Sequence, residues 1–422
     1  MVDRLPIDDE APTLRTARYF FTRLISRKRH RMSSTSLVSR LGRRVRFGII
    51  GGGLDSVIGG THLLALRTDG LADIVAGAMS IDPAVADASA AELLIDPSRR
   101  YASWQDLLAG ETAREDGVDA VVVITPPQFH GEISMAFLQA GINVLCEKPT
   151  TSTAADAAEV VRVADESGAL FTVTHCYTGY PMVREAKELV RTGVLGRITL
   201  VEGRHAAGDP GVLREPEDSS KRHWHFKPSS MGKAVVLGEV GSHAHNIVEY
   251  VTGQRVIEVT AQLTTIAKRR EIYDNAYLTL SFSDGAVGRL WSSFVAAGNE
   301  HGLAFAVYGD DGSLHWDQES PEYLWLRRPG EAAIRISRGL DSTSEASQAA
   351  TRIRPGHPEG YIMAFANIYR DFFSGVLLRL LGESSDEAVR ELPTARDGLS
   401  TIRLIEAAVE SHDRRSPVEI VL

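Results

Sequence analysis

The feature that most constrains this chain is a run of three consecutive glycines that begins at Gly51, directly after an apolar stretch over residues 45–50. A helix-like segment follows from about residue 62. A strand that turns through glycines into a helix lets the backbone approach a pyrophosphate, with the positive end of the helix dipole towards the anion. Gly53 fits the second glycine of G-x-G-x-x-G, but Ser56 occupies the third position, so an ordinary glycine-rich turn stays open as the alternative.

The second predicted strand bears on the choice of dinucleotide. Residues 72–80 form an apolar run that ends at Ser80, about where a Rossmann unit places the residue that faces the adenosine ribose. Asp82 follows two residues later. A carboxylate there hydrogen-bonds the ribose hydroxyls, whereas a basic residue suits a 2′-phosphate. Asp82 therefore favours NAD, with NADP as the open alternative.

Apolar runs alternate with helical segments through the first part of the chain. Residues 118–124 form a continuous apolar run that stops at Thr125 and Pro126, and residues 143–145 form another that stops before the E-K-P tripeptide at 147–149. Such an alternation predicts an α/β Rossmann domain with a doubly wound parallel sheet. Ligands of this architecture bind beyond the carboxyl ends of the strands, where both of these turns fall.

The second half of the chain is dominated by strands. Glycine-containing hairpin signals at 283–285 and 309–312 join several of them, which predicts an α+β domain with a large antiparallel sheet. The strand-like runs are 198–204, 256–266, 275–282, 286–294, 303–308 and 313–316. The predicted division of the chain is a basic N-terminal extension over 1–44, a dinucleotide-binding domain over 45–175, a substrate and oligomerisation domain over 176–394, and a C-terminal helix over 395–422 that packs back on the dinucleotide-binding domain.

Composition narrows the class of protein. The net charge of −9 argues against a nucleic-acid partner, and no apolar run reaches the length of a membrane span. Only two cysteines are present, Cys146 and Cys176, which gives no disulfide framework and makes a reducing cytoplasm the expected location. The basic segment before residue 45 is interpreted as a peripheral extension without catalytic residues, with a start at Met32 as an alternative.

Several motifs together resemble the Gfo/Idh/MocA family of nicotinamide-dependent sugar and inositol oxidoreductases. They are the glycine turn, T-P-P-Q-F-H at 125–130, E-K-P at 147–149, G-S-H-A at 241–244 and R-P-G-H-P-E-G-Y at 354–361. The last is similar to the branch that contains levoglucosan and glucoside 3-dehydrogenases. The resemblance spans about residues 45–420 and implies a homo-oligomer, a dimer or tetramer, formed through the outer face of the second sheet.

The resemblance also implies catalytic residues. Lys148 matches the family's catalytic lysine, whose ammonium would stabilise negative charge on the reacting oxygen. His243 matches the general base. Glu239 stands four residues before it, on the same face if the segment is helical, where the family usually has Asp. Asn246 replaces a second acid, so the details of proton transfer are expected to differ from the family's pattern.

The predicted binding residues form two sets, which combine the resemblance with the local patterns of this sequence. The predicted cofactor-binding residues are Gly51, Gly53, Leu54, Asp55, Ser56, Ile58, Ser80, Asp82, Thr125, Pro126, His130, Glu147 and Lys148. The predicted substrate-binding residues are Lys148, Tyr177, Tyr180, Arg222, Trp224, His225, Glu239, His243 and His357.

A basic and aromatic cluster at 221–227 stands out in this acidic chain. It is interpreted either as a solvated loop or as a substrate loop in which Trp224 stacks on a sugar and Arg222 or His225 pairs with an anionic group. Arg204, His205 and Arg214 could join it. A zinc site built from His223, His225, His243 and His245 is disfavoured, because His243 and His245 diverge on a helix and no cysteine is near in sequence; no metal is predicted.

The leading functional hypothesis is an NAD-dependent dehydrogenase that removes hydride from a ring hydroxyl carbon, carbon 3, of a sugar or glycoside, with an anionic sugar as one option. The alternative is a redox-neutral glycosidase, in which transient oxidation at carbon 3 permits elimination of an aglycone, addition of water and return of the hydride. A cofactor-bound protein without turnover is a third reading. Retention of Lys148 and His243 argues against it.

Overall fold

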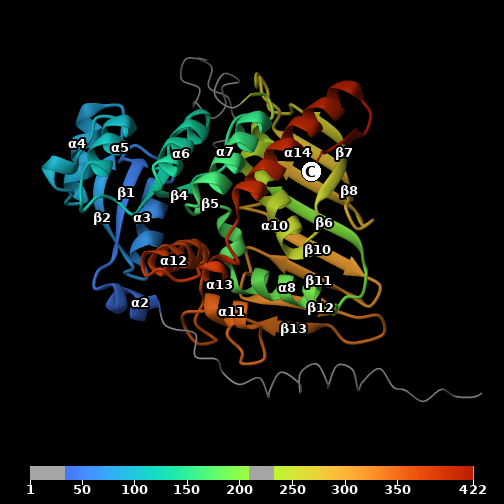
Figure 1. Cartoon of the computed structure of the whole chain (residues 1–422). Coiled ribbons are helices and arrows are strands. Elements are labelled where there is room, and N and C mark those ends of the chain that lie inside the picture. The colour runs from blue at the N-terminus through green and yellow to red at the C-terminus, as the bar shows by residue number, and fades with distance from the viewer. Residues whose placement is uncertain (1–33, 209–231, 422) are drawn as a thin grey trace, which may run out of the picture.

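The computed structural model describes residues 34–208 and 232–421. Two sheets lie side by side, with the dinucleotide-type sheet at one end of the molecule and a larger sheet at the other (Figure 1). The first sheet is parallel and five-stranded; the second is mixed and mostly antiparallel. The predicted fold class, a Rossmann domain followed by an α+β domain with a large sheet, is confirmed.

The first sheet has the strand order β2-β1-β3-β4-β5. Its strands are nearly continuous apolar runs because helices cover both faces. Side chains alternate between the two layers: Phe47 and Ile49 pack against α3 and α12, whereas Ile50 packs towards α5 and α6. The strands are β1 (Val45–Gly51), β2 (Ala72–Ala78), β3 (Ala120–Ile124), β4 (Asn143–Cys146) and β5 (Phe171–Val173).

The helical segments of this half are mostly capped by their own sequence. Ser103 and Thr153, for example, accept hydrogen bonds from the third backbone N–H of the helices that follow them. The segments are α2 (Ser34–Leu41), α3 (Gly59–Arg67), α4 (Pro83–Glu92), η1 (Pro97–Arg99), α5 (Trp104–Thr112), η2 (Pro127–Phe129), α6 (His130–Gln139), α7 (Ala154–Ser167) and η3 (Cys176–Gly179).

The second sheet has nine strands in the order β13-β12-β11-β10-β6-β9-β8-β7-β14. One face is covered by helices, including α8 and α10, and the other is open (Figure 1). The strands are β6 (Ile198–Ala206), β7 (Val256–Thr264), β8 (Asn275–Phe282), β9 (Val287–Ser293), β10 (Leu303–Gly309), β11 (Gly312–Asp317), β12 (Tyr323–Arg327), β13 (Ile334–Ser337) and β14 (Val418–Glu419). The sequence did not predict the last three.

Helical segments of the second half link the two sheets. They are α8 (Pro181–Arg191), η6 (Leu237–Gly241), α10 (Ser242–Thr252), α11 (Glu345–Ala350), α12 (Tyr361–Leu380), α13 (Asp386–Val389) and α14 (Ala395–Arg414). Helix α12 returns to the first sheet, where the Phe373 ring lies 5.0 Å from that of Phe47. Helix α14 packs on both α7 and β7, and the chain then adds β14 to the second sheet.

The basic residues before β1 are paired with acidic ones in the described part of the chain. Arg43 and Arg44 form ion pairs with Asp119 and Asp73, and Arg40 pairs with Glu383. Helix α2 itself packs against α12. Across residues 34–208 and 232–421, no helix combines the length and apolarity needed to cross a membrane.

Candidate functional site

The glycine turn ends β1 in backbone geometry that side chains rarely adopt. Gly51 and Gly52 have φ values of +76° and +69°. A Cβ at Gly51 would lie 2.6 Å from the carbonyl oxygen of Ile124, at the end of the neighbouring strand β3. The turn is therefore pressed against the carboxyl edge of the sheet, and its backbone can face a ligand without side chains in between.

Gly59 takes the role that the sequence pattern assigned to Ser56. A Cβ at Gly59 would lie 2.4 Å from the carbonyl oxygen of Gly52, so only glycine lets α3 pack this close to the turn. Ser56 instead accepts a hydrogen bond from the Gly59 backbone N–H at 3.1 Å. The connection is thus longer than the standard motif, which is why the third glycine seemed to be missing.

The rim of this turn carries the other predicted dinucleotide contacts. Leu54 and Asp55 are exposed, and the Leu54 N–H donates to Ser89 Oγ. Asp82 caps α4 through its Oδ1, which accepts hydrogen bonds from the backbone N–H groups of the second and third helical residues. The hydroxyl of Thr125 is buried and has no hydrogen-bond partner in the described chain. The bare glycine backbone and this unpaired hydroxyl fit a dinucleotide at the strand ends.

The E-K-P turn after β4 is held by a buried hydrogen-bond network. Glu147 Oε1 lies 3.1 Å from His62 Nε2 on α3, while Tyr369 on α12 lies 2.6 Å from the other nitrogen of that imidazole. Thr174 also hydrogen-bonds Glu147, and burial is outweighed by these contacts, so the pKa of Glu147 is lowered. The network connects the helix that begins at the glycine turn with the turn that carries Lys148.

His130 lies between the turn that follows β3 and the E-K-P turn that follows β4. Its two ring nitrogens lie 2.6 Å from the Thr125 carbonyl oxygen and 2.7 Å from that of Pro149. The side chain is 1% exposed. His130 and Glu147 are both engaged with the protein itself, so they shape the predicted cofactor edge from behind rather than from its surface.

Lys148 reaches across from the first domain to the second. Its Nζ lies 3.1 Å from Glu239 Oε2 and 3.2 Å from the carbonyl oxygen of Glu239. Burial lowers the pKa of Lys148, but the carboxylates of Glu239 and Glu147 outweigh this and raise it above its ordinary value. The Lys148 side chain therefore carries a positive charge, and Glu239 fixes the position of its ammonium group.

The expected pairing of Glu239 with His243 on one helical face is wrong in its local geometry. Residues 237–241 form a π-helical turn, η6, and the α-helix begins only at Ser242. The Glu239 carboxylate pairs with Lys148, and the Nδ1 of His243 is buried without a hydrogen-bond partner among the described residues. Glu239 thus positions the lysine rather than the imidazole.

His243 lies within a cluster of aromatic rings. Its ring centroid is 4.7 Å from Tyr177, 5.8 Å from His175 and 5.9 Å from His205. Burial, and after it the charge of Lys148, hold the pKa of His243 well below its ordinary value. The imidazole is consequently neutral at pH 7 and can accept a proton.

Three further rings belong to this cluster: His205, His301 and Tyr361, which come from β6, the loop before β10 and the first turn of α12. The sequence suggested His205 only as a possible companion of the 221–227 segment, and it did not single out His301 or Tyr361. Tyr177 contacts all three rings, and its hydroxyl lies 2.6 Å from His301 Nε2. Two features of the sequence pointed towards these residues: the alternation of side chains along β6, and the tyrosine that ends the G-H-P-E-G-Y motif. Neither feature predicts which residues lie opposite the side chain.

Other predicted substrate residues lie elsewhere. Arg222, Trp224 and His225 fall outside the described residues, as does the rest of the 221–227 cluster. His357 is exposed, and the structure brings Tyr361 from the same motif to the cluster instead. Arg204 points to the open face of the sheet, where it pairs with Asp317, whereas the His205 side chain is buried on the opposite face. Arg214, like the 221–227 segment that these residues were predicted to join, lies outside the described residues. Tyr180 stacks behind Tyr177.

The described residues bear only partly on the zinc alternative. His223 and His225 lie outside them. The two remaining imidazoles have different surroundings, since His245 Nδ1 lies 3.2 Å from Thr401 Oγ1 whereas His243 contacts Tyr177. Within 34–208 and 232–421, no group of three or more His, Cys, Asp or Glu side chains is arranged to hold a metal ion.

Comparison with known proteins places both halves of the chain in one family. Residues 45–175 match the model of the NAD-binding Rossmann fold of the GFO/IDH/MocA oxidoreductases, and residues 183–315 match the model of a GFO/IDH/MocA C-terminal domain. These are the two segments that carry Lys148 and His243 respectively. The first domain is therefore an NAD-binding domain.

Individual relatives cover nearly the whole chain. An oxidoreductase from Sinorhizobium meliloti shares 36% identity, with a TM-score of 0.79, over 89% of this chain and 99% of its own. An inositol dehydrogenase homologue from Azotobacter vinelandii, solved with NADH and myo-inositol, shares 31% identity with a TM-score of 0.82 over 90% and 98%. The levoglucosan dehydrogenase of Pseudarthrobacter phenanthrenivorans shares 23% identity over 88% and 97%.

Gly59→Ala should impair the glycine turn. The added methyl group meets backbone 2.4 Å away, which cannot move aside as a side chain could, so we expect a loss of about 1–3 kcal/mol in stability and NAD binding weakened by ~10-fold or more. Gly60→Ala is the matched control, because nothing lies within 4 Å of its Cβ. Calorimetric titration with NAD and thermal unfolding measure both. Equal affinity in the two variants would contradict this role of Gly59.

The buried imidazoles should make the fold sensitive to mild acid. Burial lowers the pKa of His175 to about 4 and holds those of His205 and His243 well below the ordinary value. Below pH 6.5 the unfolded chain binds protons that the folded chain does not, so each group removes up to about 1.4 kcal/mol of stability per pH unit as pH falls from 6.5 towards its native pKa.

Urea unfolding at pH 8.0, 6.5 and 5.0 tests this. We expect these groups to change the free energy of unfolding little between pH 8.0 and 6.5. Between pH 6.5 and 5.0 the free energy of unfolding should fall steeply, at pH values above the range in which carboxylates titrate. His175→Phe should flatten that loss. A stability that stays level down to pH 5 in the wild type would show that the imidazoles are not held neutral.

Proposed function

This chain belongs to the GFO/IDH/MocA family of oxidoreductases, and we propose that it oxidises a ring hydroxyl of a cyclic polyol, sugar or glycoside in an NAD-dependent reaction. The observation that carries the proposal is that Lys148, held by Glu239 at the end of β4, lies close enough to the buried ring cluster for its charge to help lower the pKa of His243. A relative at 31% identity was solved with NADH and myo-inositol, and a more distant one is named a levoglucosan dehydrogenase. Both names point to ring compounds with several hydroxyls.

The side chains divide the work of removing the hydroxyl proton. His243 is neutral, so its imidazole accepts the proton as general base. The Lys148 ammonium, fixed by Glu239, stabilises the negative charge that develops on the oxygen. When bound, NAD supplies a nicotinamide that accepts a hydride. Because Glu239 holds the lysine rather than the histidine, a change at this carboxylate acts on charge stabilisation more than on proton transfer.

For a sugar or glycoside, we propose carbon 3 as the reacting position. The support is the resemblance of the 354–361 element to the levoglucosan and glucoside 3-dehydrogenase branch. That element contributes Tyr361, whose ring lies 5.7 Å from Tyr177 in the cluster around His243. An anionic substituent on the substrate is supported by sequence alone, through the basic segment 221–227.

The test is to incubate the protein with NAD and a panel of cyclitols, free sugars and neutral or anionic aryl glycosides, while recording NADH absorbance and aglycone release together. Stoichiometric NADH without aglycone supports the dehydrogenase. Aglycone without net NADH identifies the redox-neutral glycosidase instead, since the hydride then returns to the product. Turnover of neither kind with any member would overturn the proposal.

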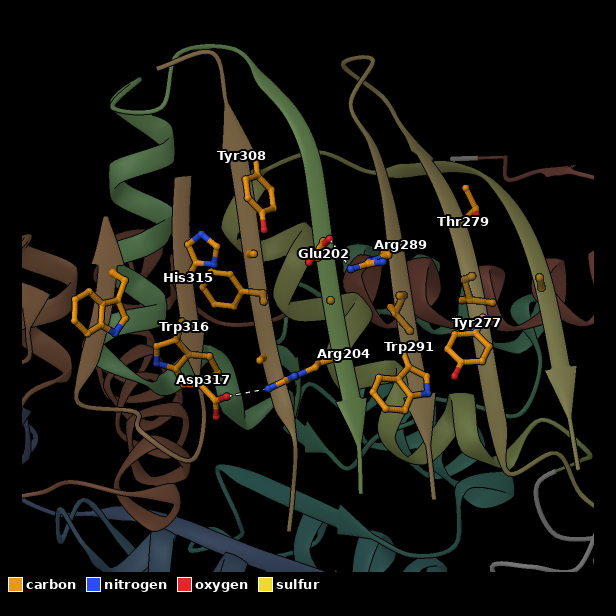
Figure 2. Close-up of a pocket in the computed structure, with 18 of the residues that line it drawn as sticks. Glu202, Arg204, Tyr277, Thr279, Arg289, Trp291, Tyr308, His315, Trp316 and Asp317 are labelled. Carbon is orange, nitrogen blue, oxygen red and sulfur yellow. Dashed lines mark hydrogen bonds and ion pairs between the residues drawn. The ribbon is translucent and has the colours of Figure 1, made fainter. Parts of the chain in front are cut away.

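We also propose that a second copy of the chain packs on the open face of the larger sheet. A hollow of about 860 Å³ lies on this face, lined by the aromatic side chains of Tyr277, Trp291 and Tyr308 (Figure 2). Tyr277 is 51% exposed, which is unusual for an aromatic residue on a sheet. The pairs Arg204–Asp317 and Arg289–Glu202 put both signs of charge on the face, as self-complementary packing requires.

His243→Asn should separate proton transfer from cofactor binding. The substitution removes the base without leaving a buried charge, so we expect kcat to fall by ~10²- to 10⁴-fold while NAD affinity is retained. His412→Asn on α14 is the control, because that imidazole binds the Leu263 backbone rather than the site. Steady-state kinetics and calorimetric titration with NAD give the two readouts. Wild-type kcat in His243→Asn would rule out the histidine as base.

Tyr277→Glu should disrupt the proposed subunit contact. A carboxylate at this exposed aromatic position would be buried without a partner between two copies, so the mass measured by light scattering should fall to that of one chain. Leu380→Glu is the matched control, since it places the same charge on a side chain that is 40% exposed at the end of α12. An unchanged mass for Tyr277→Glu would place the contact elsewhere.

A further inference from the structure

His205 lies on the inner face of β6, one residue before the strand ends. Its neighbour Arg204 points to the open face, and the alternation of the strand turns the His205 imidazole inwards, where the side chain is 2% exposed. The ring centroid lies 4.4 Å from that of His301, 5.9 Å from that of His243 and 6.1 Å from that of Tyr177. His205 therefore belongs to the same ring cluster as the proposed base.

The hydrogen bonding of His205 fixes its tautomer. Nδ1 lies 3.0 Å from the carbonyl oxygen of Val240, and because a carbonyl can only accept, Nδ1 carries the proton. Burial, followed by the nearby His301, holds the pKa of His205 well below its ordinary value, so the ring carries no second proton. Nε2 is left with a lone pair and can only accept a hydrogen bond.

That acceptor has no partner within the described chain. His205 Nε2 is buried and makes no hydrogen bond, and a buried acceptor without a partner destabilises a protein unless a ligand supplies the donor. The adjacent His301 places its Nε2 2.6 Å from the Tyr177 hydroxyl and makes no hydrogen bond to His205 Nε2. No donor among residues 34–208 and 232–421 satisfies Nε2, so this atom is available to a hydroxyl of a bound molecule.

We propose that His205 is a specificity-determining residue, whose Nε2 accepts a hydrogen bond from a hydroxyl of the substrate other than the one that reacts. This inference rests on the proposed function, because it takes a polyhydroxyl ring to bind between Lys148 and His243. A hydroxyl suits the site better than an ammonium group, since Lys148 already places a positive charge there and the histidines around it remain neutral. The 5.9 Å between the rings of His205 and His243 lets both contact one small ring compound.

A purely structural role for His205 would work through its other nitrogen. Val240 lies in η6 next to Glu239, so the Nδ1 hydrogen bond also helps to hold the turn that fixes Lys148. Two substitutions separate these roles. The asparagine amide reaches the position of Nδ1 and can still donate to Val240, whereas the glutamine amide reaches the position of Nε2 and can still accept.

The first experiment observes His205 without relying on turnover. The NAD-loaded protein is labelled with ¹⁵N-histidine, and its imidazole signals are recorded as myo-inositol, D-glucose and methyl glucoside are added in turn. We expect His205 to show a proton on Nδ1 throughout, and its Nε2 signal to shift when one of these polyols binds. If none of the three moves the Nε2 signal, the inference is overturned.

The second experiment compares kcat/KM of a substrate with its monodeoxy analogues. In the wild type, one analogue that keeps the reacting hydroxyl should be disfavoured by ~10- to 100-fold, the value of one hydrogen bond to a buried acceptor. His205→Asn should lose this discrimination by slowing the parent substrate but not that analogue. His205→Gln should retain it, and His412→Asn should behave as the wild type.

The outcomes separate the inference from the proposed function. A shifted Nε2 signal without NADH formation supports the role of His205 and contradicts the dehydrogenase. NADH formation with an unmoved signal supports the dehydrogenase and overturns the role of His205. If His205→Asn lowered kcat/KM equally for the parent substrate and every analogue, His205 would only stabilise η6 through Val240. This result would also overturn the inference.

Discussion

The ion pair between Lys148 and Glu239 is the constraint on which the site depends, because its partners come from different domains. Lys148 is delivered by the end of β4, and Glu239 by a π-helical turn that precedes α10. A partly buried ammonium is unfavourable unless a carboxylate compensates it, so the pair can form only when the two domains meet in this arrangement. Neither domain alone therefore contains the complete site, because the ion pair forms only where the two domains are in contact.

The same contact contributes to the neutral state of the imidazoles. Burial is the main cause of the lowered pKa values of His243 and His205, and the charge of Lys148, although it is paired with Glu239, adds to this effect. Protonating His243 in the free protein would place two cations side by side. The Lys148 cation therefore favours the neutral form of His243, which leaves the imidazole able to accept a proton as the proposed oxidation would require.

The sequence predicted the fold well because its signals are local. Buried parallel strands form continuous apolar runs, and recognisable turns join β8 to β9 and β10 to β11, such as the one at Gly285, which has a φ of +85°. The site was predicted less completely. Gly59 lies outside the standard spacing of the glycine motif. The π-helical turn lets the Glu239 carboxylate pair with Lys148 instead of His243. His205 and Tyr361 meet Tyr177 only in the folded chain, because β6, α12 and η3 lie far apart in the sequence.

Helix α12 shows why such contacts escape a reading in chain order. Its first residue, Tyr361, faces the ring cluster, and one turn later Phe365 contacts His62 on α3. Two turns on, Tyr369 lies 2.6 Å from the same His62, which in turn holds Glu147 beside Lys148. One amphipathic face thus contacts the ring cluster around His243, the helix of the glycine turn and the network that holds Glu147 beside Lys148. The sequence assigned α12 to the second domain, but in the structure the helix packs against both domains. The spacing of its apolar residues predicts that the helix is buried, not which elements it contacts.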